Sequence, residues 1–187
     1  AYTGGNTVPG ATTYEVFVRA KVCDSSGGAG GVEANCVQYG SNYKPEGLIQ
    51  KYAQKMRFSV FGYLNDSTQT RDGGVLRARQ KFVGPTNPVP GSSAVTNAAR
   101  EWDPTTGVYV LNPDATDATV TNTLFAPSPA IATSGVMNYL NKFGEVSPSA
   151  SYAFKSYDPV SELFYAAVRY FKNQGNVASY TDMSGAS

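Results

Sequence analysis

The sequence predicts an α/β fold, and three observations lead to that prediction. Residues 44–66, KPEGLIQKYAQKMRFSVFGYLND, begin with apolar side chains at helical spacing and continue with apolar side chains at strand spacing. The strand part is apolar on both faces, which is typical of a central strand in a sheet covered on both sides. Two amphipathic helical segments, 134–144 and 158–171, follow later. We therefore expect a mainly parallel sheet flanked by three helices, with an α+β arrangement as the fallback.

The composition indicates one folded domain of ordinary size. The chain has 187 residues, of which 41% are hydrophobic and only 16% charged, below the roughly 25% of typical soluble domains. The net charge of +1 provides no strong electrostatic field, which disfavours nucleic acid as a partner. There is no run of about 18 or more apolar residues, so we predict no membrane span. Because Ala1 is followed by no signal-peptide pattern, we expect a piece of a longer chain.

Cys23 and Cys36 are the two cysteines of the chain and enclose the Gly-rich stretch DSSGGAGGVEAN. A zinc site would need two more ligands, and the sequence has no histidine and no third cysteine. We predict a disulfide, as in secreted proteins, which would stabilise this short loop by about 3 kcal/mol. Two free thiols are the alternative.

The segments before this loop are predicted to be a lead-in and a strand. Residues 1–13 are rich in Gly, Thr and Pro and are expected to be flexible. Residues 14–23 alternate as a half-exposed strand that includes Val18 and Val22.

After the loop we expect a helix and two strands. Pro45 opens the helix, because a proline costs nothing in the first helical turn. The predicted apolar face of this helix consists of Leu48, Ile49, Tyr52 and Met56. The central strand, 58–64, and a second strand, 75–83, follow it.

Residues 84–133 are predicted to be an insertion into a domain that extends from 14 to 180, with 181–187 as a tail. The sequence DPTTG at 103–107 is a strong turn signal between Trp102 and the apolar residues 108–111. We expect a hairpin there and no regular structure in NPDATDATVTNT, which follows it. The insertion would pack on the edge of the sheet.

Two helices are expected to close the domain. Ser134 is the predicted N-cap of the first helix, whose apolar face consists of Val136, Met137, Leu140 and Phe143. The second helix is predicted to be capped by Asp158 and opened by Pro159. Its apolar stripe consists of Val160, Leu163, Phe164, Ala167, Val168 and Phe171.

The absence of histidine limits the chemistry of this chain. It removes Ser-His and Cys-His nucleophile pairs and histidine general bases. Nothing in the spacing of the glutamates brings two of them together as a glycosidase pair. These glutamates are Glu33, Glu46, Glu101, Glu145 and Glu162. We therefore predict no catalytic residues and no enzymatic activity.

A local run of basic residues is the candidate contact patch of the chain. It consists of Arg71, Arg77, Arg79 and Lys81. Such a stripe suits nucleic acid or an anionic polysaccharide. The alternative is a solvated strand face on which basic side chains discourage edge pairing.

Five collinear blocks of the sequence resemble the type IV pilus tip-associated adhesins of the PilY/PilC family. The similarity covers nearly all of residues 14–180 and is to the N-terminal half of these proteins. The blocks are CDSSGGAGGVEANCVQYGSNYKPEGLIQKYAQKMRFSVFGYLND, TRDGGVLRARQKFVGP, EWDPTTGVYVLNPD, SGVMNYLNKFG and YDPVSELFYAAVRYFKNQGNV.

The resemblance implies a fold and a role. The fold would be a von Willebrand factor A-like sheet flanked by helices, which we expect to be incomplete in this chain. The role would be that of a secreted protein at the outer cell surface or pilus tip, exported through the periplasm, that contributes to pilus biogenesis, surface attachment and surface sensing. The implied partners are minor pilins at the pilus tip and host or abiotic surfaces.

We assign no metal and no cofactor to this chain, although family members carry a calcium site in a C-terminal β-propeller that is absent here. The Asp-Ser-Ser-Gly sequence at 24–27 has the wrong spacing for the metal loop of von Willebrand factor A domains, and position 158 holds Asp where relatives have Thr. The remaining oxygen donors are interpreted as turn residues, with calcium binding as the alternative. These are Asp66, Asp72, Asp114 and Asp117.

Three other functions remain as alternatives. A structural spacer in a large surface protein would lack a concave or apolar binding patch. A polysaccharide-active enzyme would need two carboxylates about 5 to 10 Å apart in a cleft. A DNA-binding surface would show salt-sensitive binding that depends on Arg77 and Arg79.

Overall fold

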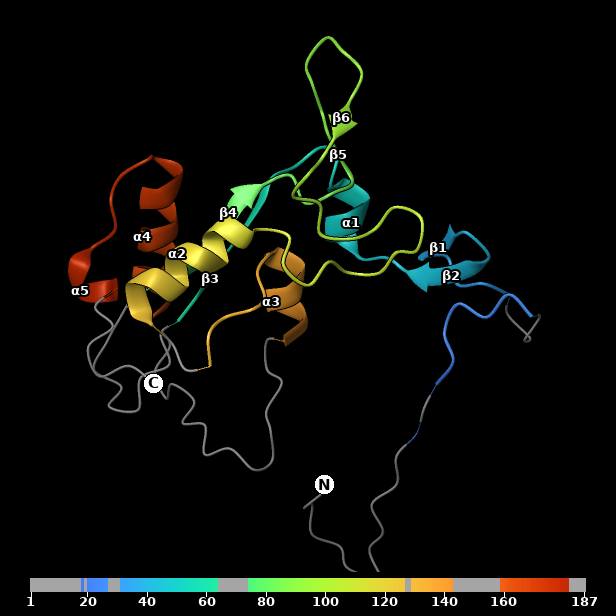
Figure 1. Cartoon of the computed structure of the whole chain (residues 1–187), viewed down its shortest axis with the longest axis horizontal. Helices are drawn as coiled ribbons and strands as arrows, with labels where there is room; N and C mark the ends of the chain where they lie inside the picture. Colours follow the sequence, from blue (N-terminus) through green and yellow to red (C-terminus); the bar gives the residue numbers. More distant parts are fainter. Residues whose placement is uncertain are drawn as a thin grey trace, which may run out of the picture. The chain divides into compact units, whose positions relative to one another are not determined.

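The chain divides into two compact units. Unit 1 is Ala1–Pro45 and unit 2 is Glu46–Ser187. The structure is a computed structural model and describes residues 18, 20–26, 31–63, 74–126, 129–142 and 159–181. Figure 1 shows the β1–β2 hairpin in unit 1, and β3 to β6 with α1 to α5 in unit 2.

Unit 1 contains an antiparallel hairpin that the sequence analysis missed. Strand β1 (Cys36–Tyr39) pairs with β2 (Asn42–Pro45), and the pair Tyr39–Asn42 encloses a two-residue turn. Gly40 in that turn has a φ of 58°, a left-handed conformation that favours glycine. Pro45 therefore ends a strand, and its predicted place in the first helical turn is wrong.

The strand predicted at 14–23 is not present in the part of it that the structure describes. Residues 18 and 20–23 have no strand conformation, and Val18 is 87% exposed. Cys23 has a φ of 56°, which interrupts extended backbone. The alternating pattern was misleading because it says nothing of whether a partner strand is available.

Helix α1 (Leu48–Tyr52) is shorter than predicted and buries a different residue. The side chain of Gln50 accepts a hydrogen bond of 2.8 Å from the backbone N–H of Gly47 at the helix start. Leu48, on the predicted buried face, is 72% exposed, whereas Ala53 just after the helix is buried. Ala53 lies against Gly84, where an added Cβ would be 2.9 Å from that of Ala53.

Strands β3 (Phe58–Gly62) and β4 (Val75–Lys81) form an antiparallel pair, with Phe58 opposite Lys81 and Gly62 opposite Val75. The register shifts on both sides of Val60. The prediction of a mainly parallel sheet is wrong for this pair, because consecutive strands joined by a short turn-rich connection pair antiparallel without a crossover. Position 64, predicted as part of the strand, lies outside the described residues.

The β3–β4 pair carries a helix on each face. Phe61 contacts Tyr170 of α4 (Val160–Phe171), with ring centroids 5.6 Å apart. Gly62, the next residue, lies against Tyr139 of α3 (Val136–Lys142). Neighbouring strand residues point to opposite faces, so α3 and α4 cover opposite sides of the pair, as Figure 1 also shows. The prediction that this strand is covered on both faces is confirmed to this extent, but its predicted central position is wrong in the described residues, where β3 pairs with β4 alone.

Residues 84–133 contain more regular structure than predicted. The two-residue strands β5 (Thr86–Asn87) and β6 (Val95–Thr96) pair antiparallel. Trp102 and Tyr109 form a bridge across the DPTTG turn, which confirms the predicted hairpin. In this turn, the carboxylate of Asp103 accepts hydrogen bonds from the backbone N–H groups of Thr105 and Thr106.

Helix α2 (Ala115–Phe125) occupies the segment that was predicted to be irregular. Its N-cap is Asp114, whose side chain accepts a hydrogen bond of 3.2 Å from the backbone N–H of Asp117. This is the ordinary capping role of Asp. Many of the residues that follow are Asp, Asn and Thr, which have low helix propensity, so periodicity did not reveal the helix.

Helix α4 has an outward-facing apolar side that the sequence analysis expected to be buried. Leu163 and Tyr170 face the sheet, but Phe164 is 69% and Phe171 is 67% exposed, and Val160 is also exposed. Asp158 lies outside the described residues, but Pro159 occupies the N-cap position and α4 begins at Val160, so the predicted start was one residue too early. A short helix, α5 (Ala178–Thr181), follows. Within the described ranges, we find no helix that is long and apolar enough to span a membrane.

The core of unit 2 is small and contains polar groups. Its most deeply buried side chains include those of Val83, Trp102 and Val136, together with Glu101 and Asn97. The Nδ2 of Asn97 donates to the carbonyl oxygens of Phe82 and Gly84, at 2.8 Å each. The described chain thus mixes helices with short antiparallel strands, as in α/β or α+β folds, and the von Willebrand factor A-like sheet stays a prediction.

Candidate functional site

Glu101 holds the start of α3 from inside the core. It is fully buried, and its two carboxylate oxygens accept hydrogen bonds from the backbone N–H groups of Val136 (2.9 Å) and Met137 (2.6 Å). The ammonium group of Lys81 lies 3.3 Å from Oε1. The carboxylate therefore satisfies two of the N–H groups that a helix leaves unpaired at its start.

Ser134, the predicted N-cap of α3, has another role. Its hydroxyl accepts a hydrogen bond of 2.8 Å from the backbone N–H of Asp114 and donates to Oδ1 of Asn112 at 2.6 Å. The hydroxyl thus connects the segment before α3 to the start of α2. The prediction failed because the acceptor for the α3 N–H groups comes from a residue 35 positions earlier in the chain.

Gly135 allows the carboxylate of Glu101 to come close to the start of α3. It has a φ of 96°, and an added Cβ would lie 2.9 Å from the carboxyl carbon of Glu101 and 2.7 Å from the ring of Pro113. Only glycine combines that backbone conformation with such close neighbours.

Arg79 is paired with the two aspartates at the start of α2. Its Nη2 donates to both carboxylate oxygens of Asp114, at 2.7 and 2.9 Å, and its Nε lies 3.6 Å from Oδ1 of Asp117. The hydrogen bond to Asp114 raises the pKa of Arg79. Burial raises the pKa of Asp114, but hydrogen bonds from Arg79 and from the N–H of Asp117 outweigh burial, so this pKa lies below its ordinary value.

Asp117 has the opposite electrostatic balance. Burial, followed by the nearby charge of Asp114, raises the pKa of Asp117, and the charges of Arg79 and Lys81 only partly offset this. The two aspartates are interpreted as helix-cap and ion-pair residues of α2, and not as the turn residues that were predicted.

Arg77 points its guanidinium toward Tyr139 on α3. Its Nη2 donates to the carbonyl oxygen of Tyr63 at 2.7 Å, and its guanidinium carbon lies 5.9 Å from the centroid of the Tyr139 ring. The Nε of Arg77 is buried and has no hydrogen-bond partner within the described ranges. A buried N–H without a partner costs stability, so the guanidinium of Arg77 is only partly satisfied within the described residues.

Arg77 also lines a cavity of about 450 Å³ between β4, α2 and α3. Its walls come from Val75 and Leu76 on β4, from Asp117, Ala118 and Thr121 on α2, from the segment before α3, and from Asn138, Tyr139 and Lys142 on α3. This volume lies in the range of small-ligand sites, which are roughly 300–1,000 Å³. The cavity is the candidate site of unit 2.

Three of the four residues of the predicted basic contact patch belong to the described part of the chain, and the patch stays a prediction. Arg79 and Lys81 are engaged by Asp114 and Glu101, Arg77 lines the cavity, and Arg71 lies outside the described residues. Arg79 and Lys81 therefore help to hold α2 and α3 on the strand pair. The cavity was not predictable from spacing, because its walls come from three separate parts of the sequence.

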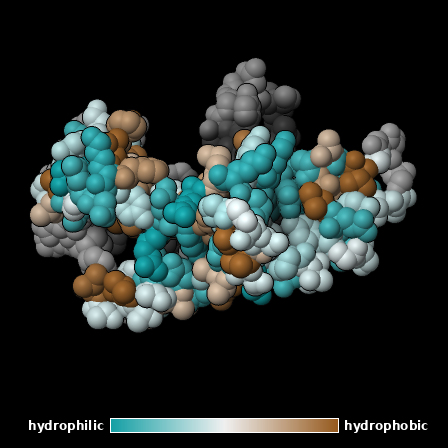
Figure 2. Space-filling view, turned by 90° about the horizontal axis from the view of Figure 1, so that it is seen from above, coloured by the Kyte–Doolittle hydropathy of each residue, from teal (hydrophilic) through white to brown (hydrophobic). Residues whose placement is uncertain are grey.

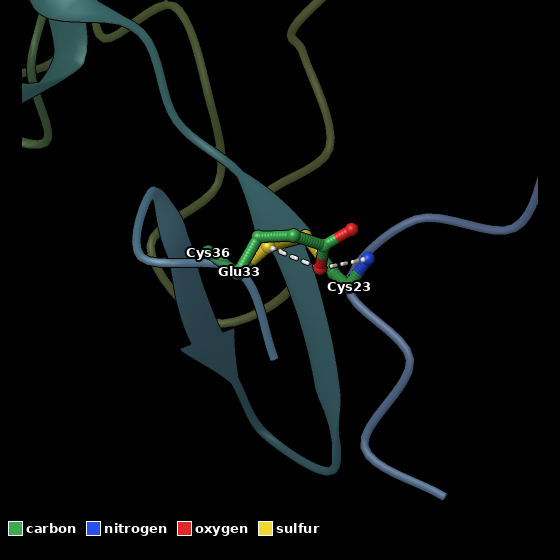
Figure 3. The surroundings of a disulfide bond; sticks show 3 residues. All are labelled: Cys23, Glu33 and Cys36. Atoms are coloured by element: carbon green, nitrogen blue, oxygen red, sulfur yellow. Dashed lines mark hydrogen bonds between the residues drawn. A yellow bond between two sulfur atoms is a disulfide. The ribbon is translucent and has the colours of Figure 1, made fainter. Parts of the chain in front are cut away.

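In unit 1, Cys23 and Cys36 form a disulfide with their Cα atoms 5.7 Å apart. Figure 3 shows Glu33 beside it: Oε2 accepts a hydrogen bond of 2.9 Å from the backbone N–H of Cys23 and lies 3.4 Å from Sγ of Cys36. The latter is a close contact, since a disulfide sulfur carries no proton. One carboxylate and two sulfurs gather here, but sulfurs in a disulfide are not thiolate metal ligands.

Asp24, in the Asp-Ser-Ser-Gly sequence, is part of a turn. Its Oδ1 accepts hydrogen bonds from the backbone N–H and the hydroxyl of Ser26, and its Oδ2 lies 2.9 Å from the ammonium group of Lys21. The hydrogen bond from the Ser26 hydroxyl, and then that from Lys21, hold the pKa of Asp24 well below its usual range.

Comparison with known proteins identifies a relative. The type IV pilus biogenesis factor PilY1 homolog of Xylella fastidiosa is 51% identical over 174 residues, which is 92% of this chain. The chain spans only 14% of the length of that relative. No family profile matches the chain, and no solved structure does. An identity of 51% over nearly the whole chain agrees with the resemblance of the sequence blocks, and the chain belongs to the PilY1 family.

Proposed function

We propose that this chain is a non-catalytic part of a type IV pilus tip-associated adhesin and acts in pilus biogenesis, surface attachment and surface sensing through protein or surface contacts. The observation that carries the proposal is the 51% identity to a relative described as a type IV pilus biogenesis factor. The protein would act outside the cell, at the pilus tip, after export through the periplasm. The disulfide supports this location, since disulfides persist in oxidising compartments.

The charged side chains of unit 2 support a binding role over catalysis. Glu101 and Asp114 hold helix starts and pair with Lys81 and Arg79. Their contacts explain them as structural groups, so neither is needed as an acid or base.

The outward side of α4 is the surface that we propose for a protein contact. Val160, Phe164 and Phe171 are exposed there, at positions that share one helix face. Figure 2 shows hydrophobic residues that reach the surface at several separate places among hydrophilic ones. Aromatic side chains on a helix are the residue type that protein interfaces favour. The partner we propose is a minor pilin.

A pull-down tests this function, with the 187-residue chain as bait and purified minor pilins as prey, with and without calcium. We expect binding to at least one minor pilin that does not depend on calcium, because we assign no metal site to this chain. The double variant Phe164→Ser/Phe171→Ser should lower the affinity by about tenfold or more.

Leu124→Ser is the matched control, since Leu124 is equally exposed but lies on α2. It should bind as the unsubstituted chain does. Lack of binding to every minor pilin, and to cell or abiotic surfaces, would reject the proposal in favour of a structural spacer.

A further inference from the structure

We propose that the cavity between β4, α2 and α3 binds a carboxylate attached to an apolar group, with Arg77 as its anchor. The inference is independent of the pilus role, because it rests on the lining of the cavity alone.

The anchor is the guanidinium of Arg77, which lines the cavity. Its guanidinium is held at one end by the carbonyl oxygen of Tyr63 and lies beside one face of the ring of Tyr139. A guanidinium that is already oriented loses little entropy when it binds an anion. Carboxylates match its planar set of donors, and charge-assisted hydrogen bonds are roughly twice as strong as neutral ones.

The charge of the lining favours an anion. Lys142 adds a second cation, whereas Asp117 contributes one carboxylate. With two positive charges against one negative charge, the lining attracts a carboxylate toward Arg77 and Lys142.

The rest of the lining favours an apolar body on the ligand. Val75, Leu76, Ala118 and Ile131 provide aliphatic walls, and Thr121 adds a methyl group. A cavity that is mostly apolar with a few convergent polar groups is the usual form of a small-ligand site. A free aliphatic or aromatic acid, or the carboxyl terminus of a peptide that ends in an apolar residue, would supply the same chemistry.

Calorimetric titration of the 187-residue chain tests the proposal with paired probes. Octanoate and 3-phenylpropionate are compared with their amides, and a peptide that ends in Leu-Phe is compared in its free-acid and amidated forms. We expect at least one acid to bind about tenfold or more tightly than its amide, since the amide lacks the charge. Binding of octanoate or 3-phenylpropionate without binding of the peptide would identify a small molecule as the source of the carboxylate. Tighter binding of the free-acid peptide would identify a chain terminus.

Variants locate the site. Arg77→Gln should lower the affinity for the acid by about tenfold or more, whereas Arg57→Gln should not change it. Arg57 is a matched control, since it also lies beside an aromatic ring, that of Phe82, but does not line the cavity. Lys142→Gln changes an exposed side chain and should weaken binding a fewfold, which keeps the test decisive if Arg77→Gln does not fold.

Three results would overturn the proposal: no saturable binding by any acid, equal affinity for acids and amides, or equal losses in Arg77→Gln and Arg57→Gln.

Discussion

At the scale of single residues, Glu101 connects two distant parts of unit 2. Its carboxylate is fully buried and joins β4, through Lys81, to the first N–H groups of α3. Because the interior offers no water to replace a lost partner, breaking the Glu101–Lys81 ion pair is costly. The intact ion pair nevertheless stabilises the fold little more than an apolar pair would.

We expect Glu101→Gln to lower the free energy of unfolding by about 3 kcal/mol, because the amide places a donor against backbone N–H groups and leaves Lys81 without its charge partner. Urea unfolding followed by circular dichroism measures this. Glu162→Gln is the control, since Glu162 is an acid close to a helix start, in the first turn of α4, but is only half-buried. The free energy of unfolding of Glu162→Gln should fall by less than about 1 kcal/mol. Equal losses in the two variants would contradict the role given to Glu101.

Two glycines with positive φ allow the costs of backbone strain and of steric conflict to be measured separately. Gly135→Ala should cost about 2 to 4 kcal/mol, because the new methyl group would collide with Glu101 and Pro113. Gly91→Ala should cost only about 1 kcal/mol, since Gly91 has a φ of 72° but open space around its Cα. Thermal unfolding of both variants gives the comparison, and a similar shift in the two would show that the space around Gly135 is not limiting.

At the scale of elements, the start of α2 places two aspartates in opposite electrostatic states. Asp114 has a lowered pKa, so its charge stabilises the fold above pH about 4, and this stabilisation is lost as the pH falls through the folded-state pKa. Asp117 has a raised pKa, so its charge destabilises the fold at neutral pH, and this penalty is relieved as the pH falls through the raised value.

The two Asp→Asn variants should therefore move stability in opposite directions at pH 7. Asp114→Asn should lower the free energy of unfolding by about 1 kcal/mol, a modest value because Arg79 is half-exposed, and its deficit should shrink toward pH 3. Asp117→Asn should raise the free energy of unfolding at pH 7. Urea unfolding between about pH 3 and 7 tests both, and a loss of stability at pH 7 in Asp117→Asn would refute the electrostatic assignment.

The elements that the sequence predicted well are those with strong local signals. The strand at 58–62, the DPTTG hairpin and helices α3 and α4 were predicted from periodicity and turn residues. Helix α2 was missed because its stabilisation comes from the Asp114 cap and from contacts with other segments. The antiparallel pairing of β3 and β4 and the exposed side of α4 depend on which surfaces meet, which a hydrophobic pattern does not specify.

The sequence pattern also did not specify which residues come together at the candidate site. The sequence indicated Arg77, Arg79 and Lys81 as one basic stripe, and only the fold separates a cavity-lining arginine from two side chains engaged in ion pairs. Glu101 was named only as one of several carboxylates, because its partners are about 20 and 35 residues away.

At the scale of the whole molecule, the division into two units predicts that a change in one leaves the other stable. Cys23→Ser/Cys36→Ser removes the crosslink of unit 1, which is worth about 3 kcal/mol for a loop of this length. Hydrogen exchange followed by mass spectrometry should show faster exchange in 36–45 and unchanged exchange in 75–81. Faster exchange in both segments would contradict independent units.

The position of Glu33 has a chemical consequence for the disulfide of unit 1. Thiols reduce a disulfide by attack of a thiolate on sulfur, and Glu33 places a carboxylate oxygen 3.4 Å from one of the two sulfurs. A negative charge so near the reacting atom repels an anionic attacker. The bond should therefore discriminate among reductants by charge: acidic thiols such as glutathione would cleave it more slowly than cationic thiols such as cysteamine, and the crosslink would outlast brief exposure to acidic thiols.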